Sequence, residues 1–188
     1  MQTRGGTRFF DYATARERMA QVIIEASREA DVIAFACDQV SGIETGDYPG
    51  EAAALAAVAR DCIRYTSDTS GEDLYKWPMF TLKTKAGDCN NKVILFGALA
   101  RSIGFPIQIC FLFDTPTPDF SGDFPSHVFA KVDVYKGERE RRLWIPVELT
   151  PMPDAVSGFP SYAVPFGCLP PMYDKFVDCV DVDEQAGV

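Results

Sequence analysis

The hydrophobic period of this sequence changes at Gly104-Phe105-Pro106. Before this point, apolar residues recur at helical spacing, and after it they alternate or run together as in strands. Glycine at position 104 suits the residue that follows a helix end, and Pro106 prevents the helix from continuing. A chain whose helices come first and whose strands come last predicts an α+β fold.

Three helical segments are expected in the first half of the chain. The first begins at Tyr12, where Thr14 and Glu17 form a capping box, and its apolar spacing continues to Ala34. The others span about 51–65 and 88–103. Between them, the stretch 74–82 is expected to be extended, because Pro78 is unfavourable inside a helix.

Three strands are expected in the second half, at 107–113, 127–135 and 142–149, with a polar hairpin turn at 136–141 between the last two. We therefore expect N-terminal helices and a central helix packed on an antiparallel β-sheet. The chain divides into an N-terminal helical extension (1–50), a core (51–151), and an irregular proline-rich segment with an acidic tail (152–188).

Composition and charge limit the classes of partner that the chain can bind. The chain has 188 residues, enough for one domain with a sizeable core, and its net charge of −9 argues against nucleic-acid binding, which needs a basic face. The longest uncharged apolar run, 32–37, is too short to cross a membrane, and the first residues contain no apolar segment of a secretory signal. We expect a cytoplasmic protein with no membrane and no nucleic acid as partner.

The cysteines and the histidine limit the chemistry. His127 is the single histidine, which excludes a multi-histidine metal site, and no C-x-x-C pair indicates structural zinc. Without a secretory signal, free thiols are the better expectation, most of them in the core, although an even number could form disulfides. The six cysteines are Cys37, Cys62, Cys89, Cys110, Cys168 and Cys179.

Cys89 is the first candidate for catalysis, because it opens the third expected helix in the run Gly-Asp-Cys. At a helix start, unpaired backbone N–H groups and the helix dipole favour a thiolate. Asp88 is expected to cap this helix, and Gly87 would allow a substrate backbone to approach closely. A lone cysteine in such a place is more often structural than catalytic, so the assignment depends on its partners.

His127 and Glu148 are the candidate partners. His127 begins an alternating strand, and folding the hairpin at 137–139 brings Glu148 roughly opposite it. A carboxylate beside an imidazole orients the ring and stabilises its charged form. A solvated edge-strand glutamate is the simpler alternative, but the apolar run 144–147 before Glu148 weakens it. Together with Cys89, these residues predict a nucleophile, a base and an orienting acid.

These residues resemble the transglutaminase-like superfamily, which has a compact papain-like core. The resemblance covers about 52–151, and its lead-in, YTSDTSGED followed by KWPMFTL, is similar to that of bacteriophage and prophage members. The motifs that carry it are GDC at 87–89, GFP at 104–106, SHVFAKVDVY at 126–135 and WIPVELTP at 144–151.

The resemblance implies a cysteine enzyme that performs acyl transfer on an amide of a protein or peptide substrate. Cys89 would attack the carbonyl carbon, His127 would transfer protons, and Glu148 would orient His127. Water would complete hydrolysis, or an amine would complete transamidation, with no metal and no cofactor. The Cys89 backbone N–H and Trp77 are candidate oxyanion donors.

A second hypothesis is that the fold is catalytically silent. The family usually has Asp where this chain has Glu148, and often another Asp where it has Asn90 or Asn91. The chain would then be a structural or binding component, for example of a phage virion, with phage structural proteins as partners. Its location would be the virion or the cytoplasm of a bacterial or phage-infected host.

Overall fold

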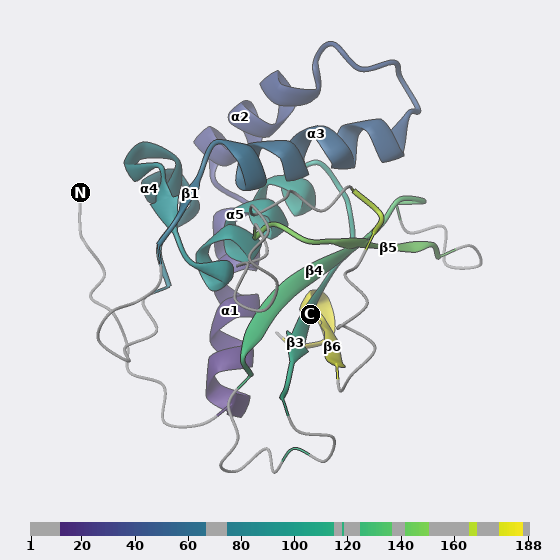
Figure 1. The fold of residues 1–188 in the computed structure, drawn as a ribbon. Coiled ribbons are helices and arrows are strands. Elements are labelled where there is room, and N and C mark those ends of the chain that lie inside the picture. The colour runs from purple at the N-terminus through teal and green to yellow at the C-terminus, as the bar shows by residue number, and fades with distance from the viewer. Residues whose placement is uncertain are drawn as a thin grey trace, which may run out of the picture.

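The computed structural model describes residues 12–66, 75–114, 118, 125–136, 142–150, 166–168 and 177–185. In this part of the chain, helices pack against a four-stranded antiparallel sheet, as expected for an α+β fold (Figure 1). The helices are α1 (Tyr12–Ala26), α2 (Ala30–Val40), α3 (Tyr48–Asp61), α4 (Pro78–Thr84), α5 (Cys89–Ser102) and α6 (Val182–Gln185). The strands are β1 (Arg64–Tyr65), β2 (Ala86–Gly87), β3 (Ile107–Leu112), β4 (His127–Asp133), β5 (Trp144–Val147) and β6 (Val177–Asp181).

Helix α5 is the centre of the molecule. It contacts α1, α2, α3 and α4 as well as β3 and β4. Every residue from Asn91 to Ala100 is buried, as expected for a helix that is covered on all sides. The helix ends as predicted, because Gly104 has a φ of +97° and the Phe105 N–H donates to the Ala100 carbonyl at 3.1 Å.

The larger sheet has the order β5-β4-β3-β6, and all neighbouring strands are antiparallel. The face that includes Val128, Ala130 and Val132 belongs to the same apolar core as α5. A second, two-stranded parallel sheet joins β1 to β2, immediately before α5. The sheets therefore fix α5 from two directions, at its start through β2 and along its length through β4.

Three expectations about the first half of the chain were wrong. The first expected helix is two helices, α1 and α2, separated at 27–29, where the Ser27 hydroxyl donates to the Ile24 carbonyl. Such a local bond competes with helix continuation. Thr14 lies inside α1 and not at its start. Residues 78–82 are helical and not extended, because Pro78 occupies the first turn of α4, where proline is tolerated.

The acidic tail contributes a strand that the sequence analysis did not expect. Strand β6 pairs with β3 and places Cys179 directly opposite Cys110, with the Cα atoms 4.1 Å apart, and the two form a disulfide. The expectation of free thiols was therefore wrong for this pair. The expectation of mostly buried cysteines was also wrong, since Cys37, Cys62 and Cys168 are exposed.

Some expectations fall on parts of the chain that the structure does not describe. The turn at 137–141, the lead-in residues 67–74, the first residues 1–11 and most of the proline-rich segment 152–176 lie outside the described ranges. The division of the chain into three parts stays a prediction. Among the described helices, none is both long and apolar enough to cross a membrane.

Candidate active site

Cys89 is the first residue of α5, as the sequence predicts. Asp88 caps this helix, because its Oδ1 accepts the Asn91 backbone N–H at 2.8 Å. The Asn91 side-chain amide donates to the same oxygen at 2.8 Å. Cys89 itself is partly buried. Its position on the first turn places the thiol beside backbone N–H groups that have no partner within the helix.

The chain is packed tightly where it enters α5. A Cβ atom on Gly87 would lie 2.8 Å from the Asn91 Cβ, so a larger residue would push the helix start away from β2. Asn91 also accepts the Lys76 backbone N–H on its Oδ1 at 2.6 Å. Packing against Asn91 is therefore sufficient to require glycine at position 87.

His127 and Glu148 are in direct contact. The His127 Nε2 lies 2.9 Å from the Glu148 Oε2, and their side chains are 16% and 0% exposed. The Cys89 side chain lies close enough to His127 to raise the pKa of its ring. Because Nε2 is bonded to Glu148, Nδ1 is the ring nitrogen that remains for the thiol. The structure thus brings together all three residues that the sequence singled out.

The surroundings of His127 favour its charged form. Burial lowers the pKa of the imidazole, but hydrogen bonds with Cys89 and Glu148, together with the charges of these groups, raise it to about 9. The ring is therefore an imidazolium at neutral pH and loses its proton only as the pH rises through about 9. An imidazolium beside a cysteine is the arrangement that thiolate chemistry requires.

Glu148 reaches His127 from a position that differs from the expected one. The register pairs Ala130 with Val147, and one further step would put Glu148 opposite Phe129, not opposite His127. Strand β5 ends at Val147, so Glu148 is no longer part of the ladder. Its second oxygen, Oε1, accepts the Thr150 backbone N–H at 2.7 Å. The carboxylate is therefore held from both sides, by His127 on one oxygen and by Thr150 on the other.

Trp77 is already engaged elsewhere. Its indole N–H donates to the Glu29 Oε2 at 2.6 Å, next to the start of α2. The indole nitrogen carries one hydrogen, so Trp77 is a poor candidate for an oxyanion donor. Of the two candidates that the sequence suggested, the Cys89 backbone N–H is the better one.

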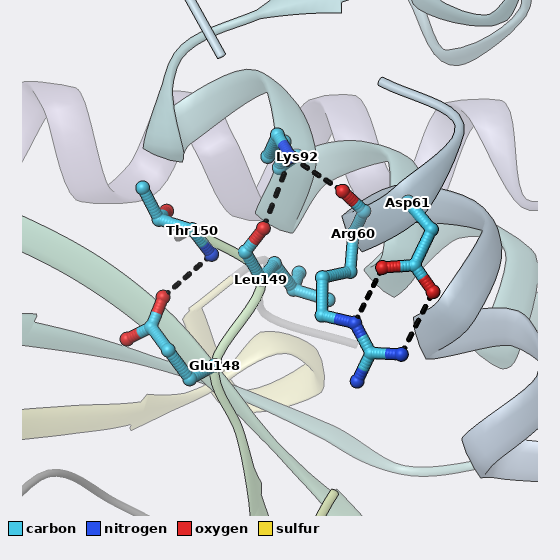
Figure 2. A network of polar contacts seen from close by, with 6 residues as sticks. All are labelled: Arg60, Asp61, Lys92, Glu148, Leu149 and Thr150. Atoms are coloured by element: carbon cyan, nitrogen blue, oxygen red, sulfur yellow. Dashed lines mark hydrogen bonds and ion pairs between the residues drawn. The ribbon is translucent and has the colours of Figure 1, made fainter. Parts of the chain in front are cut away.

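Lys92 is a polar residue near the site that the sequence analysis did not single out. It lies three residues after Cys89 in α5, and its side chain is buried with 0% exposure. Its Nζ donates to a backbone carbonyl next to Glu148, as Figure 2 shows. A charged residue directly before the apolar run 93–100 could have drawn attention to it. Among the described residues, no group of three or more His, Cys, Asp or Glu side chains could hold a metal ion.

Comparisons with known proteins identify the family and the fold. A model of the transglutaminase-like superfamily matches residues 34–149. A crystal structure from Parabacteroides distasonis ATCC 8503, described as a "putative protease", has a TM-score of 0.58 at 10% sequence identity. The similarity covers 74% of this chain and 27% of that one, so the chain spans about a quarter of the length of that protein. A search of curated proteins found no match.

Proposed function

The chain belongs to the transglutaminase-like superfamily, and we propose that it is a cysteine enzyme that transfers acyl groups from an amide of a protein or peptide. The observation that carries this proposal is the chain of contacts from Cys89 through His127 to Glu148. A nucleophile, a proton carrier and an orienting acid in contact are what such chemistry needs. The description of the structural neighbour as a protease is consistent with it.

The first half of the reaction forms a thioester. The Cys89 sulfur attacks the amide carbonyl carbon, and the developing oxyanion is placed near the Cys89 backbone N–H at the start of α5. As the tetrahedral intermediate collapses, the C–N bond breaks and His127 gives its proton to the leaving amine. Glu148 keeps the ring in place and offsets its positive charge.

The second half releases the acyl group. His127, now neutral, takes a proton from water or from an amine, which attacks the thioester carbonyl. The C–S bond breaks and the Cys89 thiolate is restored beside the imidazolium. With water the product is a carboxylic acid, and with an amine it is a new amide. Substrate access to Cys89 and the competition between water and amine decide between the two.

Replacement of the nucleophile tests this proposal. In Cys89→Ala, hydrolysis or transamidation of a casein-type protein substrate should fall by about three orders of magnitude or more, because no thioester can form. Cys62→Ala is the matched control, because Cys62 is exposed and lies at the end of α3. Activity that persists undiminished in purified Cys89→Ala would show that the mechanism is wrong.

The silent alternative predicts a different outcome. If Glu148 in place of Asp made the site inactive, Cys89 would be no more reactive than the exposed cysteines, and the chain would act as a structural or binding component, with phage structural proteins as one class of partner. The 2.9 Å contact between Glu148 and His127 favours the enzyme, because the longer side chain still reaches the ring.

A further inference from the structure

The burial of Lys92 requires an explanation. Its side chain is 0% exposed, and an ammonium group inside a protein is costly unless it is paired and hydrogen-bonded. Lys92 lies one helical turn beyond Cys89, within the stretch of α5 that is otherwise buried against apolar neighbours. A methionine or leucine would satisfy the packing at this position, so the charge and the donors of Lys92 point to another role.

The Lys92 ammonium joins three elements. Its Nζ donates to the Arg60 carbonyl at 2.9 Å and to the Leu149 carbonyl at 3.1 Å (Figure 2). Arg60 is in the last turn of α3, where carbonyls lack partners within the helix. Leu149 directly follows Glu148. One side chain thus connects the helix that carries Cys89 with the segment that carries Glu148.

Three charged groups face this ammonium. Arg60 and Asp61 lie at the end of α3, where the guanidinium and the carboxylate are paired at 2.7 and 2.8 Å, and Glu148 lies after β5. Burial lowers the pKa of Lys92 to about 8, while the charges of Asp61 and Glu148 act to raise it and that of Arg60 to lower it. At neutral pH the side chain is therefore mostly charged.

The segment that carries Glu148 lies beyond the end of a short edge strand. Strand β5 is an edge strand of four residues that pairs with β4, and its one further backbone bond among the described residues comes from the Gly167 N–H to the Pro146 carbonyl. Beyond Val147 the ladder has ended. The Lys92 bond to Leu149 acts on the stretch beyond the strand, one residue from the carboxylate that holds His127.

We propose that Lys92 is a positioning residue, which holds the Leu149 backbone so that Glu148 stays bonded to His127. The inference rests on the proposed function, since it assigns Lys92 to the same Cys89–His127–Glu148 site. The Lys92 Nζ donates to two backbone carbonyls and not to the thiol or the imidazole. Its effect on the reaction passes through the position of Glu148.

The single histidine of the chain provides a direct readout. The pKa of His127 is measured from the pH dependence of its imidazole proton resonance, in protein without a histidine tag, so that the signal is unambiguous. Lys92→Met should lower this pKa by about one pH unit or more, because Glu148 would be held less well beside the ring. A direct charge effect would act in the opposite direction, since removal of a nearby cation raises the pKa of an imidazole.

A double-mutant cycle separates positioning from other effects. In a Glu148→Gln background, Lys92→Met should no longer lower the His127 pKa, because the group that Lys92 positions has lost its charge and only the direct charge effect remains. Lys83→Met is the matched control, since it removes a lysine charge from an exposed position of α4. Circular dichroism of each variant shows whether it is folded. If Lys92→Met does not fold, Lys92→Gln keeps an N–H donor on a shorter side chain, and the same fall of smaller size is expected.

The inference and the proposed function can fail separately. An unchanged or raised His127 pKa in Lys92→Met, or an equal fall in the Glu148→Gln background, would overturn the positioning role. Neither result depends on turnover. Conversely, Cys89 could be unreactive while the His127 pKa falls as expected in Lys92→Met. This result would overturn the proposed enzyme function, but Lys92 would keep its positioning role.

Discussion

The two sides of the site are held in different ways. On the Cys89 side, the principal support is local, because Asp88 caps α5 through the N–H of Asn91, three residues later. On the Glu148 side, the Thr150 N–H bond is local, but two further contacts are long-range, since His127 is 21 residues away in sequence and the Lys92–Leu149 bond spans 57 residues. A local cap can be recognised from the sequence, whereas an edge-strand end held by a buried lysine depends on the whole fold.

The largest effect is expected on the long-range side. Glu148→Gln should reduce turnover by about two to four orders of magnitude, because the imidazolium loses its orienting charge. The pKa of His127 should fall below its value of about 9. Since His127 must be protonated to release the amine, activity in the wild type should decline as the pH rises through about 9, and in Glu148→Gln the decline should begin at lower pH.

The control for this substitution is Glu51→Gln. The Glu51 carboxylate pairs with Lys136 at 2.8 Å, and this ion pair lies away from the three site residues. It should leave both the pH profile and turnover unchanged. Identical pH profiles for wild type and Glu148→Gln would contradict the role given to Glu148.

The same contrast explains how much the sequence could predict. The start of α5 at Cys89, its end before Gly104 and the strands β3 and β4 follow from local periodicity and capping, and these predictions were confirmed. The contact of His127 with Glu148 was predicted, although the register places Glu148 nearest to Phe129 and not directly opposite His127. Strand β6 could not be predicted, because its pairing with β3 comes from a distant segment of the chain.

A second effect should appear in the sheet, outside the contacts that join Cys89, His127 and Glu148. Reduction of the Cys110–Cys179 disulfide with dithiothreitol should lower the free energy of unfolding by about 2–4 kcal/mol, because the bond closes a long loop between β3 and β6. Urea denaturation under oxidising and reducing conditions measures it. The His127 pKa should move less than in Glu148→Gln, since neither cysteine takes part in the bond between His127 and Glu148.

The Cys110→Ser/Cys179→Ser double variant should reproduce the reduced protein. Equal unfolding midpoints for the oxidised and reduced forms would contradict a stabilising role for the disulfide.

The smallest effect is expected on the local side. Asp88→Ala should cost about 1 kcal/mol of stability through loss of the helix cap. Asp47→Ala is a matched comparison, because Asp47 caps α3 in the same way and accepts the Gly50 N–H at 3.0 Å. Chemical denaturation of both variants should give similar losses.

The Asp88→Ala variant should also shift the His127 pKa less than Glu148→Gln does, because the contact between His127 and Glu148 is left intact. A larger shift in Asp88→Ala would show that the two sides are not held separately.

The most direct test of the account is the alkylation rate of Cys89 as a function of pH, measured by peptide mass spectrometry in wild type and His127→Ala. The exposed residues Cys37, Cys62 and Cys168 are internal references. We predict that Cys89 is alkylated fastest at mildly acidic pH, and that this advantage disappears in His127→Ala, because the imidazolium no longer stabilises the thiolate. Alkylation of Cys89 no faster than that of the three references would contradict a poised thiolate–imidazolium pair.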